Sequence, residues 1–164
     1  MSVKESADTA RRRRRLTMAI KDSLRAMNNQ LSLLNHHVGR RVDLKDVDLD
    51  CLDLIDRHGP LSPSTLARRA GLHPATMTGV LDRLQRAGWI TRDRDPEAAD
   101  RRAVAVRTLR TRGRELYHLY AGMNHSMDEI CARYSDAELA VVADFLHRTT
   151  AAGRDATDVL ARDE

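Results

Sequence analysis

Aromatic residues and cysteines are scarce in this sequence. One Phe, one Trp and three Tyr occur among 164 residues, so Leu, Val, Ala and Met must supply most of the hydrophobic core. The two cysteines, Cys51 and Cys131, form neither a CxxC metal motif nor the framework of a disulfide-rich domain. The sequence therefore excludes small disulfide-stapled scaffolds and cysteine-ligated zinc modules.

Long apolar runs are absent as well. No segment approaches the roughly 20 apolar residues that a transmembrane helix needs. The five arginines at positions 11–15 are followed by charged residues at Lys21, Asp22 and Arg25, which interrupt the apolar run of a secretory signal. We therefore expect a cytoplasmic protein without a membrane partner.

Motifs of catalytic and cofactor chemistry are also missing. The sequence contains no GxSxG, no phosphate-binding glycine loop and no HExxH, so we expect no enzymatic activity and no cofactor. The histidines are interpreted as solvated or core residues rather than metal ligands, because no cysteine joins them. Cys51 is interpreted as an inert buried thiol, since nothing basic lies beside it in the sequence.

Charge is abundant. Charged residues make up 32% of the chain, the formal net charge is +4, and most of the basic residues are arginine. A basic excess favours an anionic partner such as nucleic acid. The arginines at 11–15 are interpreted as a weak electrostatic contribution to that binding, because five cations at a helix N-terminus oppose the helix dipole.

Apolar periodicity predicts two helices in the first third of the chain. Apolar residues recur every three or four positions from Leu16 to Val38, which indicates a long amphipathic helix that closes near Gly39. A second helix is expected to follow Asp48 and to stop at Gly59.

Two further long helices are predicted after about residue 109. A heptad-like apolar stripe runs from Leu116 to Tyr134, and Ser135 and Glu138 form the capping box of a last helix. The tail after Gly153 is polar and is expected to fray. The apolar stripe from Leu16 to Val38 and the one from Leu116 to Tyr134 are both too long for a domain of roughly 100 residues to cover. They therefore predict a homodimer. The alternative is that the stripes pack within one chain.

The stretch LSPSTLARRAGLHPATMTGVLDRLQRAGWI, residues 61–90, has the pattern of a helix-turn-helix. Ser62 and the following proline begin its first helix, Gly71 permits the turn, and Pro74 opens its second helix. If Met77 points inward, the opposite face of the second helix carries small residues first and arginines later. Such a face suits the major groove, where short side chains approach the bases and cations contact phosphates. The alternative is a surface helix with solvated arginines.

The DNA-binding residues predicted for this region lie at the start of the first helix or on the outward face of the second. They are Ser62, Ser64, Ala75, Thr76, Thr78, Gly79, Arg83 and Arg86.

Two short strand-like segments flank a charged loop, RDRDPEAADRRAV, at residues 92–104. A two-stranded ribbon after a helix-turn-helix makes a winged helix. From about Leu49 to Val106 the sequence resembles the MarR family of transcriptional regulators, through CLDLI, GPLSPSTLARRAGL, TMTGVLDRLQRAGWI and RDRDPEAADRRAVAV in that order. Within the loop, Asp100-Arg101-Arg102 looks like the family's wing-tip Asp-x-Arg. The chain departs from the family at residues 108–113, where TLRTRG stands in place of Leu-Thr-x-x-Gly.

The resemblance implies a mainly α fold, a winged helix-turn-helix with a two-stranded β-hairpin wing and long helical dimerisation extensions. The expected division is an N-terminal helix at 1–47, the winged helix-turn-helix at 48–108, C-terminal dimerisation helices at 109–152 and a polar tail at 153–164. In the wing, Arg102 is expected to insert into the minor groove, Asp100 to orient it, and Arg101 to contact phosphate or solvent.

By the same resemblance, the chain is expected to bind double-stranded DNA as a homodimer at an inverted repeat and to act as a repressor released by a small molecule. Family analogy places that ligand between the second helix and the long helices, near His36, His37 and Arg40. The alternative function is a winged-helix module for protein–protein contacts without specific DNA binding.

Overall fold

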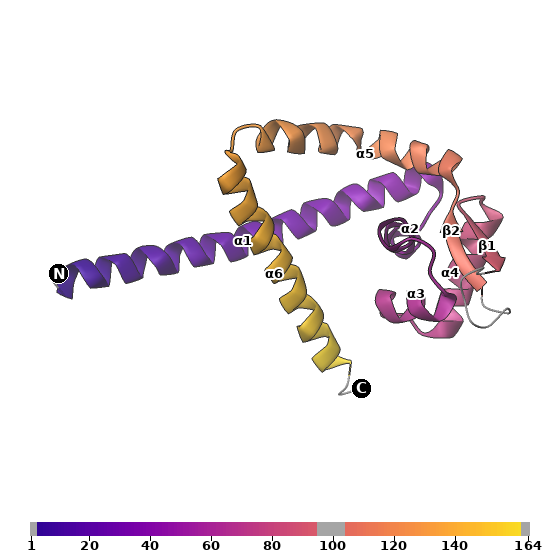
Figure 1. Ribbon diagram of the computed structural model, residues 1–164, viewed down its shortest axis with the longest axis horizontal. Helices are drawn as coiled ribbons and strands as arrows, with labels where there is room; N and C mark the ends of the chain where they lie inside the picture. Colours follow the sequence, from indigo (N-terminus) through magenta and orange to yellow (C-terminus); the bar gives the residue numbers. More distant parts are fainter. Residues whose placement is uncertain (1–2, 95–103, 162–164) are drawn as a thin grey trace. The chain divides into compact units, whose positions relative to one another are not determined.

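The computed structural model describes residues 3–94 and 104–161, which form two compact units, Met1–His118 and Leu119–Glu164. The described part contains six helices and a two-stranded sheet (Figure 1). In chain order the elements are α1 (Val3–Val42), α2 (Asp46–His58), α3 (Pro63–Ala70), α4 (Pro74–Arg86), β1 (Ile90–Arg94), β2 (Val104–Thr108), α5 (Arg110–Cys131) and α6 (Asp136–Leu160). The mainly α fold with a hairpin wing is confirmed.

The helix-turn-helix forms where the sequence predicts it. The Ser62 hydroxyl accepts a hydrogen bond from the Thr65 amide at 3.2 Å, so it caps α3 directly before the proline that opens the helix. Gly71 ends α3 in the left-handed conformation with φ 64°, which a glycine adopts without steric cost. The backbone then turns into α4, whose Met77 is buried as expected.

The hydrophobic core lies in the first unit, between α2, α3, α4 and the root of the hairpin. Its largest fully buried side chains belong to Trp89, Ile55, Leu66, Met77, Leu81, Leu84, Ile90, Val80 and Val106. Burial of each large apolar side chain contributes roughly 1.5–3 kcal/mol, so this cluster is the main source of stability in the unit. The inward face predicted for the second helix of the helix-turn-helix is confirmed.

The hairpin strands pair antiparallel, with a register that runs from Ile90 opposite Thr108 to Arg94 opposite Val104. The segment before α3 also joins β2, because the Val106 amide donates to the Leu61 carbonyl at 2.8 Å. This bridge connects the wing to the start of the helix-turn-helix, and no local pattern in the sequence predicts it.

The first helix is longer than its periodicity indicated, because α1 passes through Gly39 and ends at Val42. A Cβ atom at position 39 would lie 2.6 Å from the Leu44 carbonyl oxygen and 3.3 Å from a methyl of Leu49. Gly39 therefore permits the close approach of the turn into α2 instead of ending the helix. The Leu44 amide also donates to the Gly39 carbonyl at 2.9 Å.

The second unit contains the end of α5 and the whole of α6. The predicted capping box is confirmed, with the Ser135 amide donating to Glu138 Oε2 at 2.9 Å. The helix was predicted to fray after Gly153. This prediction is wrong, since α6 continues to Leu160. A polar composition leaves this stretch exposed without ending the helix. Among the described helices, none combines the length and apolarity that crossing a membrane requires.

Candidate DNA-binding surface

The outward face of α4 begins with small side chains. Ala75, Thr76 and Thr78 are exposed, and Gly79 is half-buried. The Thr78 hydroxyl donates to the Pro74 carbonyl at 3.0 Å. His73 caps the helix, because its Nδ1 accepts from the Ala75 amide at 3.2 Å. Short side chains at a helix start allow close approach to DNA.

The two arginines predicted on α4 have different surroundings. Arg86 is exposed, and its Nε donates to the Asp82 carbonyl within the same helix at 3.2 Å. Arg83 is directed back toward α2, where its Nη2 lies 2.6 Å from Asp48 Oδ1 and its Nε lies 3.3 Å from Asp48 Oδ2. The hydrogen bond to Asp48 raises the pKa of Arg83 above its usual value. Arg83 is therefore held in an ion pair within the fold.

The two serines at the start of α3 also differ. Ser62 is half-buried and its hydroxyl is occupied by the cap and by a 2.9 Å contact with Thr65 Oγ1. Ser64 is exposed, with its hydroxyl 3.1 Å from that of Ser62. Ser64 thus has the more accessible hydroxyl for a DNA phosphate.

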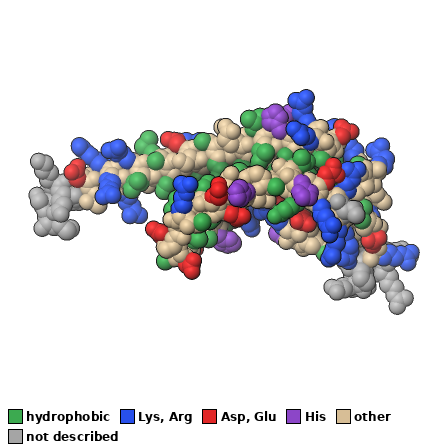
Figure 2. All heavy atoms as spheres, turned by 90° about the horizontal axis from the view of Figure 1, so that it is seen from above, with side chains coloured by type: hydrophobic (Ala, Val, Ile, Leu, Met, Phe, Trp, Pro, Cys, Tyr) green, Lys and Arg blue, Asp and Glu red, His purple; other side chains and the backbone are tan. Residues whose placement is uncertain are grey.

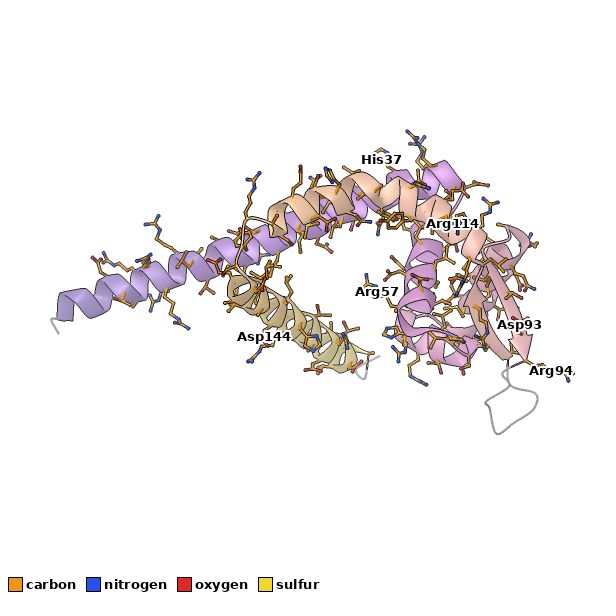
Figure 3. All side chains as sticks on the ribbon, turned by 45° about the horizontal axis from the view of Figure 1, so that its top comes forward. His37, Arg57, Asp93, Arg94, Arg114 and Asp144 are labelled. Atoms are coloured by element: carbon orange, nitrogen blue, oxygen red, sulfur yellow. The ribbon has the colours of Figure 1, made fainter. Side chains whose placement is uncertain are left out.

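The root of the wing is attached to α4 by an ion pair. Arg92 Nη2 lies 2.5 Å from Asp82 Oδ1, which joins β1 to the second half of α4. Asp93 and Arg94 are exposed at the far end of the described hairpin (Figure 3). The predicted wing-tip residues Asp100, Arg101 and Arg102 lie outside the described residues. The position of the wing root relative to α4 is nevertheless fixed by named contacts.

The start of α5 is attached to the corner between α4 and β1. Arg112 Nη2 donates to the Ala87 carbonyl at 3.3 Å, and its guanidinium carbon lies 4.9 Å from the centroid of the Trp89 ring. The Leu109 amide donates to the Trp89 carbonyl at 2.9 Å. These three contacts connect the start of α5 to the segment that follows α4, and none of them was expected from the sequence.

The residues predicted to line a ligand cavity are only partly brought together. Arg40 lines a cleft of about 450 Å³ next to α2 and α4, together with Gly39, Asp43, Leu44, Lys45, Asp48 and Arg83. His36 lies outside this cleft, exposed, with its Nδ1 3.5 Å from Asp46 Oδ1. His37 is also exposed, on the side of α1 away from α2 (Figure 3).

The described residues contain neither a cluster suited to a metal ion nor an activated thiol at Cys51. No cluster of three His, Cys, Asp or Glu side chains suited to a metal ion occurs within residues 3–94 and 104–161. Cys51 is buried, and desolvation together with Asp48 and Asp50 raises the pKa of its thiol to about 11. At neutral pH Cys51 is therefore a neutral thiol. On the face seen in Figure 2, Lys and Arg side chains gather along the N-terminal part of α1, where positions 11–15 are all arginine.

Comparison with known proteins agrees with this geometry. Residues 44–104 match the model of the MarR family. The Bacillus subtilis protein YcgE, named an uncharacterized HTH-type transcriptional regulator, is 26% identical over 74% of this chain and 78% of its own length. YetL of Bacillus subtilis, named an HTH-type transcriptional repressor, is 35% identical over 48% of this chain and 46% of its own length.

The fold is shared with a solved structure that contains DNA. Streptococcus pneumoniae FabT in complex with DNA has a TM-score of 0.64 and 23% identity, covering 85% of this chain and 98% of FabT. The matched family is one of transcriptional regulators and not of enzymes. Over residues 44–104 the chain thus matches the MarR family, and its described part has a winged helix-turn-helix fold.

Proposed function

We propose that the protein is a sequence-specific repressor that binds an inverted-repeat operator in double-stranded DNA as a homodimer. The observation that carries this proposal is the division of α4 into two faces. One face is buried in the core through Met77 and its neighbours, and the other carries exposed small and hydroxyl side chains followed by Arg86. An outward face of this kind fits the major groove.

Uncovered apolar side chains support the homodimer. In the single chain, Leu16 and Ile20 of α1 and Met123, Met127 and Ile130 of α5 remain between about a third and three fifths exposed. Monomeric proteins rarely leave such stripes in water, whereas a second copy covers them in a symmetric interface. We assign this role to residues 1–47 and 109–152, and we leave the polar tail at 153–164 outside it.

A small-molecule effector is proposed to act in the cleft lined by Arg40. Its volume of about 450 Å³ lies within the usual range for ligand pockets, roughly 300–1,000 Å³. The cleft borders both α2 and α4, so an occupant there is placed to shift the helix that reads DNA. A repressor of this design works in the cytoplasm, where its operator is located.

The proposal is tested by DNA binding and by the oligomeric state. In a salt-titrated mobility shift, we expect the protein to bind a fragment upstream of its own gene more tightly than a scrambled fragment of equal length. Half-sites should lie about 10 to 10.5 bp apart, one helical turn. Equal binding to both fragments would favour the alternative, a protein–protein interaction module. A monomer at micromolar concentration in analytical ultracentrifugation would contradict the homodimer.

A further inference from the structure

Asp48 is the one charged side chain that is buried among those the structure describes, with 1% of its surface exposed. It belongs to α2 and lies outside the predicted DNA-contacting residues. A buried carboxylate is strongly destabilising unless it is paired and hydrogen-bonded. Its retention at this position therefore requires partners, and those partners connect two helices.

Both oxygens of Asp48 are occupied. Oδ1 accepts from Arg83 Nη2 at 2.6 Å, while Oδ2 accepts from Arg83 Nε at 3.3 Å and from the Lys45 amide at 3.1 Å. The Lys45 contact caps the first turn of α2. One carboxylate thus fastens the start of α2 to Arg83, which lies 35 residues later on α4.

We propose that Asp48 is a positioning residue for operator recognition, and that Arg83 serves as its anchor on α4 instead of as a phosphate contact. The inference rests on the proposed function, in which α4 reads the operator. Apolar packing through Met77 is not directional. A two-point contact between guanidinium and carboxylate fixes direction as well as distance, so it sets the angle at which α4 presents its outward face.

Displacement of α4 affects specific and non-specific binding differently. Contacts to base edges depend on the placement of the helix, whereas non-specific binding depends on the number of cations near phosphates. Loss of the Asp48–Arg83 pair should therefore lower operator affinity while leaving affinity for scrambled DNA almost unchanged.

A direct phosphate contact by Arg83 gives the opposite sign for one substitution. In that case Asp48 competes with DNA for the guanidinium, and Asp48→Asn frees Arg83 and removes a negative charge. Operator binding should then become tighter. The positioning role instead requires Asp48→Asn to weaken operator binding, although it makes the protein more positive.

The experiment measures affinities for an operator duplex and a scrambled duplex by fluorescence anisotropy over a range of salt concentrations. The variants are Asp48→Asn, Arg83→Gln, Arg83→Lys and the double variant Asp48→Asn/Arg83→Gln. Asp50→Asn is the matched control, because Asp50 is an exposed carboxylate on the same helix. Thermal denaturation of each variant fixes a temperature at which all are folded.

We expect Asp48→Asn to weaken operator binding about tenfold or more, with scrambled DNA and Asp50→Asn close to wild type. The double variant should be no weaker than the weaker single variant, because both remove the same contact. Arg83→Lys should behave like Arg83→Gln, since a lysine keeps the charge without the two-point geometry.

Three results would overturn the inference. One is operator binding by Asp48→Asn that is unchanged or tighter than wild type. Another is operator binding by Arg83→Lys with wild-type affinity, together with a salt dependence of binding by Arg83→Gln whose slope is smaller by about one. That combination indicates a lost phosphate contact. The third is a lower melting temperature for Asp48→Asn with an unchanged ratio of operator to scrambled affinity, which indicates a purely structural role.

The proposed function fails separately, if the wild-type protein itself shows no preference for an operator. A crystal structure of Arg83→Lys without DNA then tests whether the Asp48–Arg83 pair positions α4. An α4 rotated relative to the wild type supports the positioning role, and an α4 in the wild-type position overturns it. The same structure replaces Asp48→Asn if that variant does not fold.

Discussion

Gly79 offers a sharp test of which face of α4 meets DNA. A Cβ atom added there has Arg83 Nη1 as its nearest neighbour, at the ordinary contact distance of 3.7 Å. A larger side chain therefore fits without displacing the core. Replacing glycine within a helix also stabilises the helix by about 0.5 kcal/mol or more. We expect Gly79→Glu to fold at least as stably as the wild type.

The effect of Gly79→Glu on DNA binding should be large. If the outward face of α4 enters the major groove as proposed, a carboxylate there meets phosphates, and two unit charges 4 Å apart near a protein surface interact by up to about 4 kcal/mol. The new carboxylate also lies one helical turn from Arg83, where an ion pair contributes about 0.3–0.5 kcal/mol. Asp48 keeps Arg83 against this weaker competitor, because it is buried and holds two of its nitrogens.

The assay compares Gly79→Glu with the neutral and equally large Gly79→Gln and with Gly79→Ala. Anisotropy with the operator duplex should show at least about a tenfold loss for the glutamate over the glutamine, and a small effect for the alanine. Melting temperature and dimer mass should be preserved in all three. A drop in melting temperature would mean that the faces of α4 are assigned wrongly. Equal losses for glutamate and glutamine would mean that bulk, and not charge, is excluded there.

Three further outcomes follow from named contacts. Asp82→Ala removes the partner of Arg92 at the wing root and should weaken operator binding by about 1 kcal/mol although it deletes a negative charge; unchanged anisotropy titrations would refute this. Met127→Glu places a charge in the apolar stripe of α5 and should shift the protein toward monomer in analytical ultracentrifugation, and a persistent dimer would place the interface elsewhere. Cys51, with a buried thiol of pKa about 11, should resist iodoacetamide in the native protein at neutral pH, and rapid labelling there would contradict its burial.

Local signals explain why the helix-turn-helix was predictable from sequence. Ser62 and Gly71 act on their own backbone within a few residues, so their roles follow from residue type. The inward face of α4 follows from apolar spacing around Met77, because a helix of 3.6 residues per turn admits one such face. These features needed no knowledge of distant contacts.

Long-range contacts explain what the sequence left open. Asp48 has the same residue type as a solvated helix-start carboxylate, and its partner Arg83 lies on another helix. Gly39 has the residue type of a helix stop, whereas the fold uses its missing side chain for the approach of Leu44. Arg112 similarly reaches Ala87 across 25 positions. In each case residue type allows two roles, and only the packing of distant segments selects one.

The wing gives the last prediction, which depends on its sequence motif and on the described root of the hairpin. β1 ends at Arg94, and β2 begins opposite it at Val104. If Arg102 inserts into the minor groove, a narrow and strongly negative A·T-rich groove should attract it most. Arg102→Ala should then weaken operator binding by roughly 1–3 kcal/mol, more with A·T-rich flanks than with G·C-rich flanks.

Asp100 distinguishes an oriented arginine from a loop of interchangeable charges. As a carboxylate two residues before Arg102, it can hold the guanidinium through a charge-assisted hydrogen bond and set its direction. Asp100→Ala should therefore weaken operator binding, although simple electrostatics predicts that losing a negative charge strengthens it. Arg101→Ala is the matched control and should lower affinity for A·T-rich and G·C-rich flanks alike. Tighter binding by Asp100→Ala would show that these residues act only as solvated surface charges, which contribute little.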